Sequence, residues 1–247
     1  KDGDEVIRAV KSAVECGYRS IDTAAVYKNE SGVGEAIKVC GVPRDELFIT
    51  TKVYNDQQGY DNTLQAFEES LQRLQLDDVD LYLIHWPVKD KFKETWKAME
   101  RLYKEGRAKA IGVCNFHVHH LERLLEDAEV VPAVDQVEFH PLLAQRKLLE
   151  YCRNKGIQLE AWSPLMHGNF NEIDLSDLAK KYGKTPAQII LRWDIQQGVV
   201  TIPKSVTPSR IEENSQIFDF ELSAEDMDRI TAMNQDRRFG RDPNSFD

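Results

Sequence analysis

The sequence predicts a parallel α/β barrel of the (β/α)8 type, formed by a single domain over residues 1–247. Two observations predict this fold class. Strand-like and helical segments alternate seven times, which is typical of parallel strands joined by helical crossovers. The strand-like segments also end on polar side chains, and barrels of this type gather their chemistry at the carboxyl ends of the strands. No linker, charge block or shift in composition divides the chain.

The individual elements follow from periodicity and turn residues. Val10 and Val14 repeat at helical spacing, Thr185 followed by Pro186 is typical of a helix start, and Gly106 of a helix end. Strands are predicted at residues 18–22, 47–52, 79–84, 108–113, 133–138, 157–162 and 199–202. In the first half, helices are predicted around Val10, from Asn29, from about Asp61 and over 92–105. In the second half, they are predicted around Leu121, around Leu148, as a pair whose second member begins at Thr185, around 208–214, and from Ser223.

The strand count is one short of a closed barrel. The chain begins with a helix, so we expect a first strand before Lys1 that this sequence does not contain. Seven strands alone would leave exposed edges, which are costly. The alternative, a doubly wound nucleotide-binding sheet, should show GxGxxG after its first strand. Gly32 and Gly34 are the nearest match, but Ile37 stands at the third glycine position, so the barrel is favoured.

Composition excludes several classes of function. A chain that is 41% hydrophobic and 30% charged is typical of soluble globular proteins, and a net charge of −10 argues against a nucleic-acid binder. No apolar run is long enough to predict a membrane span, and the first residues lack the form of a signal peptide. The four cysteines form no CxxC pair, which favours the reducing cytoplasm. Size and acidity suit a monomer.

Three successive predicted strands end on titratable side chains, namely Asp22, Lys52 and His85, and Tyr27 follows the first of them in a turn. A buried acid is costly unless it is paired, and Lys52 is the candidate partner of Asp22. Taken one at a time, these residues are explained by a structural ion pair, a half-buried tyrosine and a core histidine. Their shared place at strand ends favours an active site. Asn115, Gln136, Trp162 and Lys204 fall at the ends of later strands.

Further residues admit a binding or a structural interpretation. Lys204 and Arg210 flank a strand end and a helix start, an arrangement that suits a phosphate, although solvated surface charge is the alternative. Tyr54 and Trp86 are interpreted as pocket walls rather than core packing. The histidines within residues 117–120 lack a third ligand type, so we expect a polar helix start and no metal site.

Taken together, these motifs resemble those of the aldo-keto reductases along almost the whole chain. The order of the motifs is more specific than any one of them. Similarity is strongest to small bacterial members, some of which reduce short dicarbonyls or keto-sugars. The motifs are GYRSIDTAAVYKNE, TTKV, DLYLIHWP, AIGVCNF, DQVEFHP, AWSPL and VVTIPKSVTPSRIEEN.

The resemblance implies NADPH-dependent reduction of small aldehydes, ketones or dicarbonyls to alcohols. It makes Asp22, Tyr27, Lys52 and His85 a catalytic tetrad with Tyr27 as proton donor. Tyrosine has a pKa near 10, and we expect the charge of Lys52 to lower it, with Asp22 orienting Lys52 and His85 orienting the carbonyl oxygen. The implied cofactor residues are Asn115, Gln136 and Ser163 at the carboxamide, Trp162 stacked on the nicotinamide ring, Leu165, and Lys204, Ser205, Arg210, Glu213 and Asn214 at the adenosine end, with Lys204 and Arg210 on a 2′-phosphate.

The sequence also departs from the family pattern. Cys114 stands where serine is more common, which weakens one expected cofactor contact, and the N-terminal hairpin and first strand are absent. The tail after Asn234 is short, so a more open and less selective pocket is expected. Two alternatives remain: a catalytically silent cofactor-binding or structural relative, and a different barrel enzyme such as an isomerase or aldolase.

Overall fold

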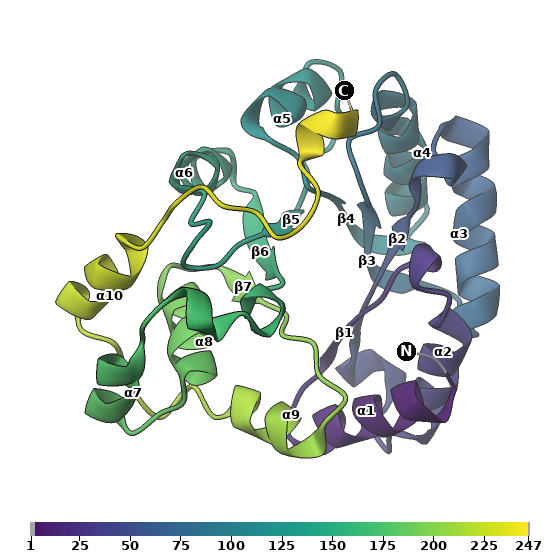
Figure 1. The fold of residues 1–247 in the computed structure, drawn as a ribbon. Coiled ribbons are helices and arrows are strands. Elements are labelled where there is room, and N and C mark those ends of the chain that lie inside the picture. The colour runs from purple at the N-terminus through teal and green to yellow at the C-terminus, as the bar shows by residue number, and fades with distance from the viewer. Residues whose placement is uncertain (1–2, 247) are drawn as a thin grey trace.

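A computed structural model describes residues 3–246. Within that range, seven parallel strands lie side by side in chain order and form one curved, open sheet with helices around its outside (Figure 1). Each strand pairs only with the strands before and after it in the chain. The strands are β1 (Ser20–Asp22), β2 (Phe48–Val53), β3 (Val79–Ile84), β4 (Ala108–Cys114), β5 (Val134–Glu138), β6 (Gln158–Trp162) and β7 (Val200–Thr201).

The α-helices are α1 (Asp4–Glu15), α2 (Glu30–Val39), α3 (Tyr60–Leu74), α4 (Phe92–Lys104), α5 (Val118–Leu125), α6 (Arg146–Lys155), α7 (Ser176–Tyr182), α8 (Pro186–Gln196), α9 (Pro208–Ser215) and α10 (Ala224–Thr231). Helices α2 to α8 connect successive strands, as the sequence predicts for a parallel sheet, whereas α1 precedes β1 and α9 and α10 follow β7. Short 3₁₀ turns lie at Ala25–Tyr27, Arg44–Glu46, Asn55–Gln57, Met166–Gly168, Phe170–Glu172 and Pro243–Phe246.

Local chemistry explains where several elements begin and end. The Thr185 hydroxyl accepts a hydrogen bond from the Gln188 amide (3.3 Å) and caps α8, which then begins at a proline as predicted. Ser223 caps α10 in the same way through the Asp226 amide (3.2 Å). Strand β7 is only two residues long because Pro203, which has no amide hydrogen, soon follows it.

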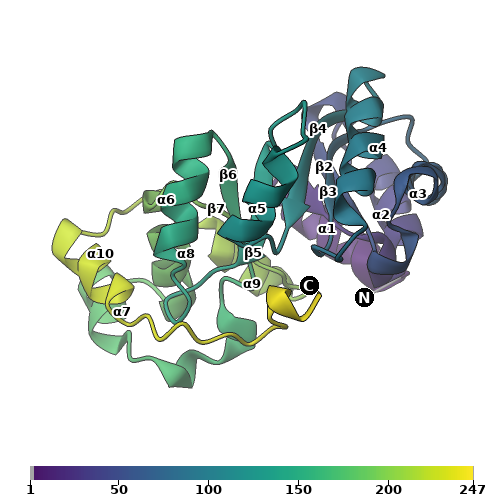
Figure 2. The ribbon, with the colours of Figure 1, turned by 90° about the horizontal axis from the view of Figure 1, so that it is seen from above.

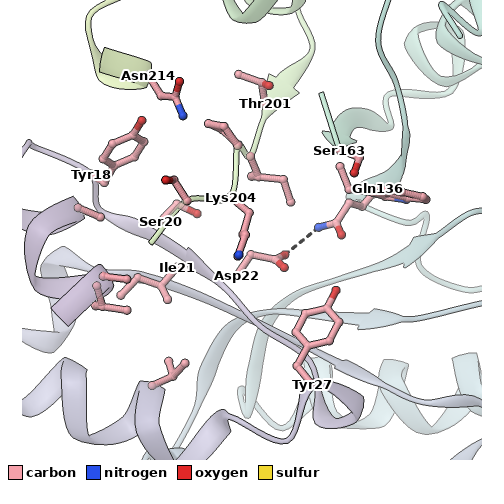
Figure 3. Close-up of a pocket in the computed structure, with 18 of the residues that line it drawn as sticks. Tyr18, Ser20, Ile21, Asp22, Tyr27, Gln136, Ser163, Thr201, Lys204 and Asn214 are labelled. Atoms are coloured by element: carbon pink, nitrogen blue, oxygen red, sulfur yellow. Dashed lines mark hydrogen bonds between the residues drawn. The ribbon is translucent and has the colours of Figure 1, made fainter. Parts of the chain in front are cut away.

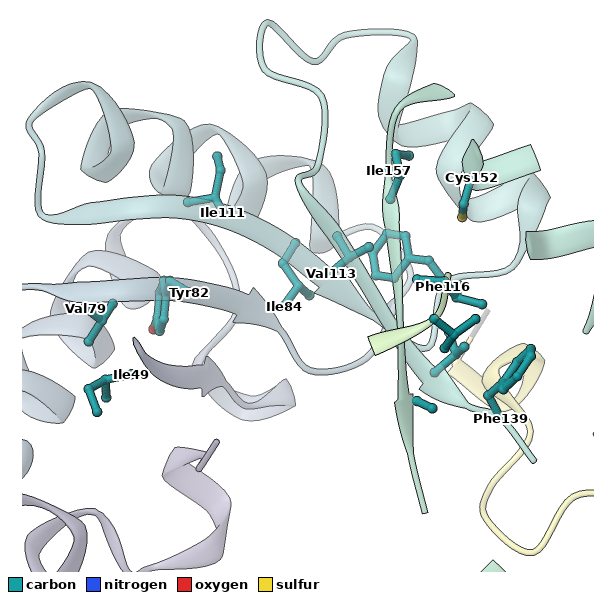
Figure 4. Packing of buried hydrophobic residues seen from close by; sticks show 14 of the residues in the cluster. Ile49, Val79, Tyr82, Ile84, Ile111, Val113, Phe116, Phe139, Cys152 and Ile157 are labelled. Atoms are coloured by element: carbon teal, nitrogen blue, oxygen red, sulfur yellow. The ribbon is translucent and has the colours of Figure 1, made fainter. Parts of the chain in front are cut away.

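Two apolar layers hold the sheet in place. The larger layer packs the outer face of the strands against the helices and includes Tyr82 and Ile84 of β3 and Val113 of β4 (Figure 4). The smaller layer lies inside the curve and contains Leu81, Leu83 and Cys114. Because side chains alternate between the two faces of a strand, β3 supplies both layers, and all of its residues are buried.

The sheet is open between its first and last strands. In the part of the chain that the structure describes, β1 pairs only with β2, β7 pairs only with β6, and no eighth strand lies between them. The α/β barrel architecture is confirmed, with the seven strands that this sequence predicts. No helix among residues 3–246 has both the length and the apolar character needed to cross a membrane.

The C-terminal strap, which we define as residues 235–246, leaves α10 and runs back across the sheet towards α5 (Figures 1 and 2). The amides of Gln235 and Arg237 donate to the Leu142 carbonyl (3.1 and 3.0 Å). At the far end of the strap, the Lys89 amide donates to the Phe246 carbonyl (2.9 Å). The strap therefore joins the α10 side of the molecule to the loop that follows β3.

Candidate active site

Strands β1 and β2 place Asp22 and Lys52 against each other. The Lys52 ammonium is fully buried, donates to the Asp22 carboxylate, and donates to the Thr23 carbonyl at 2.9 Å. Burial opposes the charge of Lys52, but Asp22 and Tyr27 outweigh that effect, so the pKa of Lys52 lies above its usual value. The lysine is therefore charged at neutral pH, and the structure contains the ion pair that the sequence suggested.

Tyr27 and His85 lie beside this pair. The Lys52 Nζ is 5.2 Å from the centre of the Tyr27 ring, and the rings of Tyr27 and His85 meet edge to face with centres 5.8 Å apart. The Tyr54 ring also meets the His85 ring edge to face, with centres 5.6 Å apart, and Trp86 lies parallel to the imidazole at 6.4 Å. The structure thus gathers at one place the four residues that the sequence predicted as a tetrad.

One expectation about Tyr27 is corrected. The pKa of Tyr27 is raised rather than lowered, because desolvation of the phenol outweighs the lowering effect of the Lys52 charge, and Asp22 raises the pKa further. Tyr27 is 47% exposed towards the pocket, so solvent reduces these effects. In this state Tyr27 holds its proton at neutral pH, with the ammonium in place to favour the phenolate when the proton leaves.

His85 carries no charge at neutral pH. Burial, followed by repulsion from Lys52, lowers its pKa from 6.5 to about 3. Its Nδ1 is buried and has no hydrogen-bond partner among the described residues. The Asn115 side-chain amide donates to the His85 carbonyl at 3.0 Å, which fixes the backbone that carries the ring.

The carboxyl ends of β4, β5 and β6 add amide groups and an indole. The Trp162 Nε1 donates to the Asn115 Oδ1 at 2.8 Å, so the indole is held in one orientation. The Gln136 Nε2 donates to Asp22 at 2.8 Å and to Glu160 at 2.6 Å. Asn115 and Ser163 have left-handed backbones (φ 63° and 48°), and strained conformations of this kind often occur at functional sites.

These groups border a single open pocket of about 810 Å³ (Figure 3), a volume typical of ligand sites. Most of the residues that the sequence predicted line it: Asp22, Tyr27, His85, Trp86, Asn115, Gln136, Trp162, Ser163, Lys204, Ser205 and Asn214. The predicted residues outside this lining are Lys52, Tyr54, Leu165, Arg210 and Glu213.

The residues outside the lining differ in what they contact. Lys52 contacts the Asp22 carboxylate, which does line the pocket, and Tyr54 packs on His85. Leu165 packs against the outer apolar layer. The Glu213 carboxylate accepts a hydrogen bond from the Thr185 hydroxyl at 2.8 Å and so ties α9 to the start of α8.

The pocket continues from the tetrad towards the open side of the sheet. There it is lined by Ala9 and Ala13 of α1 on one side and by residues 200–206 on the other. Lys204 is exposed and extends into the pocket (Figure 3), and Arg210 on α9 is also exposed. Neither cation forms an ion pair with any other residue of the range 3–246.

The C-terminal strap packs against two residues that line the pocket, Trp86 and Trp162. The ring of Phe246 stacks on Trp86 with centres 4.7 Å apart. The amides of Phe239 and Gly240 donate to the two oxygens of the buried Glu138 carboxylate at 2.7 and 3.0 Å. Gly240 lies so close to the Trp162 indole that a Cβ would come within 2.4 Å of it. The strap therefore supports the lining of the pocket without being part of it.

Two acidic residues of the site were not predicted. Glu138 holds the strap, and Glu160 contacts Gln136 beneath the pocket. The period of two along a strand could have found both, because Glu138 shares a face with Gln136, and Glu160 shares a face with Trp162. The strap itself shows no periodic pattern that could have indicated its path.

Comparison with known proteins agrees with this geometry. The model of the Aldo/keto reductase family matches residues 1–235. The chain belongs to the aldo/keto reductase family. The family resemblance inferred from the motifs is thereby confirmed, and the structure shows which of the family's motif residues share one pocket.

Individual members of the aldo/keto reductase family are similar over nearly the whole chain. A glyoxal reductase of Bacillus subtilis (strain 168) is 63% identical, over 100% of this chain and 90% of its own length. The crystal structure of an aldo-keto reductase from a deep-sea metagenome library has a TM-score of 0.95 at 47% identity, covering 98% of this chain and 91% of its own. The Bombyx mori aldo-keto reductase, crystallised in complex with NADP, has a TM-score of 0.89 at 39% identity, covering 95% and 84%.

Proposed function

We propose that this chain catalyses the NADPH-dependent reduction of small aldehydes and dicarbonyls to alcohols. The observation that carries the proposal is the convergence of the buried Lys52–Asp22 pair, Tyr27 and His85 at one pocket. The similar glyoxal reductase of Bacillus subtilis supports a small dicarbonyl as substrate, and the Bombyx mori complex with NADP supports the cofactor.

The residues present fit such a cofactor. Among the described residues, nothing donates to the Gln136 Oε1, so this oxygen is free to accept from a carboxamide, and the Ser163 hydroxyl lines the same pocket. The Trp162 indole is held by Asn115 beside them. Lys204 is a cation without an ion pair in the described chain and suits a phosphate. When bound, NADPH supplies the hydride that adds to the carbonyl carbon.

The chain's own residues then handle the oxygen of the substrate. His85, uncharged, donates a hydrogen bond that fixes the carbonyl oxygen beside Tyr27. Tyr27 gives its proton to this oxygen as negative charge develops there, and the charge of Lys52 stabilises the phenolate that remains. Asp22 and the Thr23 carbonyl hold the ammonium in place throughout, and Tyr27 regains a proton from water.

The test is direct. Purified protein is mixed with NADPH and, in turn, glyoxal, methylglyoxal and a panel of simple aldehydes, and the loss of NADPH absorbance is followed. We expect turnover with at least the dicarbonyls, and the ranking of kcat/KM identifies the preferred substrates. If NADPH binds but none of the panel is reduced, the catalytically silent alternative is correct and the proposed activity is wrong.

A further inference from the structure

The side-chain amide of Gln136 is held at one end by two carboxylates. Its Nε2 donates to Asp22 of β1 (2.8 Å) and to Glu160 of β6 (2.6 Å), and Figure 3 shows the first of these bonds. An ionised carboxylate can only accept hydrogen bonds, so both contacts require the NH₂ end of the amide. The two hydrogens of Nε2 are thereby used, and Oε1 is the end left over.

Glu160 is an unusual group to find there. Glu160 is 8% exposed, and the only hydrogen bond of its side chain among the described residues is to Gln136. The cation nearest to it, Lys52, already contacts Asp22. A buried carboxylate without a cation of its own is costly, and the proposed chemical step makes no use of it. Some other role therefore has to account for a glutamate at this position.

The groups that face Glu160 come from several strands. Asp22 lies on β1, Lys52 on β2 and the uncharged thiol of Cys114 on β4. Lys204, from beyond β7, extends into the pocket that Gln136 lines. Burial, followed by repulsion from Asp22, raises the pKa of Glu160 to about 7, against the lowering effects of Gln136 and Lys52. Glu160 thus changes charge near neutral pH.

We propose that Glu160 is a positioning residue for the cofactor: together with Asp22 it fixes the Gln136 amide so that Oε1 faces the nicotinamide carboxamide. This inference rests on the proposed function, because it assumes that NADPH binds in this pocket. An amide without the second carboxylate can turn and present NH₂ to the ligand instead. A protonated Glu160 can itself donate to Oε1 and so competes with the cofactor for the same acceptor.

The experiment separates the two halves of the cofactor. Dissociation constants are measured calorimetrically for NADPH and for 2′-phospho-ADP-ribose, which lacks the nicotinamide, on the wild type and on Glu160→Gln. Loss of one hydrogen bond weakens binding roughly tenfold. In Glu160→Gln the new amide can donate to the Gln136 Oε1, as a protonated Glu160 does, so we expect that loss for NADPH and no change for 2′-phospho-ADP-ribose.

The ratio of the affinity for NADPH to the affinity for 2′-phospho-ADP-ribose should also depend on pH. In the wild type, the preference for NADPH over the truncated ligand should fall as the pH drops through about 7, since Glu160 takes up a proton. Both ligands carry the 2′-phosphate, so its own titration cancels in the ratio. In Glu160→Gln the ratio should not change with pH.

A matched control removes a different buried carboxyl. Asp194 of α8 is fully buried and contacts Thr201 at 2.8 Å rather than Gln136, so Asp194→Asn should leave the ratio unchanged. A Glu160→Gln protein that binds both ligands as the wild type does, or loses both equally, overturns the inference. If that variant does not fold, a wild-type ratio that is constant between about pH 5.5 and 8.5 overturns it. A wild type that binds 2′-phospho-ADP-ribose but not NADPH overturns both this inference and the proposed function.

Discussion

The two ends of the pocket differ in how their polar groups are paired. At the proposed reaction end, which comprises Asp22, Tyr27, Lys52 and His85, the two charged groups, Lys52 and Asp22, already pair with each other, and Lys52 is fully buried. At the proposed phosphate end, which comprises Lys204, Ser205, Arg210 and Asn214, the cations are exposed and form no ion pair within the described chain. Ser205 contacts only the backbone of Thr207 there.

This difference indicates where the free energy of each step arises. Groups that are fixed in advance stabilise developing charge without a cost of reorganisation, which suits the reaction end. Exposed, unpaired cations lose little hydration when an anion arrives, which suits a binding end. Chemistry and cofactor affinity should therefore be separable by mutation, and the predictions below test that separation.

The largest expected effect on turnover comes from a mutation that changes the reaction end alone. Tyr27→Phe removes the proposed proton donor, and we expect kcat to fall by about 10²- to 10⁴-fold. The dissociation constant of NADPH should not change, because the phosphate end is untouched. Steady-state kinetics and calorimetry measure the two quantities. Tyr18→Phe is the matched control, because Tyr18 also lines the pocket yet makes no contact with Lys52; undiminished kcat in Tyr27→Phe would contradict the assignment.

The complementary mutations remove the two cations at the phosphate end. Lys204→Ala and Arg210→Ala should each weaken NADPH binding roughly tenfold to a hundredfold, the value of a hydrogen bond to a charged group, with kcat at saturating cofactor unchanged. Affinity for NADH, which lacks the 2′-phosphate, should change little. The loss should shrink at high salt because these charges are exposed. Lys180→Ala on α7 is the control, and equal losses for NADH and NADPH would exclude a 2′-phosphate site.

A smaller effect is expected from the C-terminal strap, which packs against Trp86 and Trp162. In Gly240→Ala the new Cβ would lie 2.4 Å from the Trp162 indole and 3.0 Å from the Glu138 carboxylate, so the C-terminal strap or the indole has to move. Overpacking of this kind costs about 1–3 kcal/mol. We expect KM for the carbonyl to rise several-fold, with a lesser change in kcat. Asn244→Ala on the exposed part of the strap should have neither effect; kinetics of Gly240→Ala equal to wild type would show that the strap does not position the indole.

The sequence predicted the sheet and the meeting of the strand-end side chains because both depend on short-range patterns, whereas the tetrad itself was implied by the family resemblance. Apolar runs fix the strands, and the residue that ends each parallel strand necessarily lies at the same edge of the sheet, which is why Asp22, Lys52 and His85 converge. The same reasoning considered only the last residue of each strand. It therefore omitted Glu160, two positions before Trp162, although both side chains point to the same face.

Other features could not be predicted from local patterns. The C-terminal strap is irregular, and its partners Glu138 and Leu142 are about a hundred positions away in the chain. The pKa of Tyr27 depends on the balance between desolvation and the Lys52 charge, and the sequence shows only that both residues exist. Which of two opposing effects prevails is a property of the packed site.

The stability of the folded chain should depend on His85 in a defined pH window. Its pKa is lowered from 6.5 to about 3 by burial and then by Lys52, so folding favours the neutral ring. The contribution is present above about pH 6.5 and is lost as the pH falls towards 3, where the unfolded chain binds the extra proton. His85→Gln should flatten that part of the curve of unfolding free energy against pH, as measured by urea denaturation.

The same lowered pKa predicts that His85 has no effect on the shape of the pH–rate profile. Between about pH 5 and 9 the ring stays neutral, so His85→Gln should lower kcat/KM without removing any ionisation step from the profile. A step near pH 7 is still expected in both proteins, since Glu160 titrates there, and only Glu160→Gln should abolish it. A step that disappears in His85→Gln but persists in Glu160→Gln would mean that His85 is charged during catalysis. In that case the imidazole would be more exposed to solvent in the working enzyme than it is in this structure. The reaction end would then not be fixed before the substrate binds, and it would differ less from the open phosphate end.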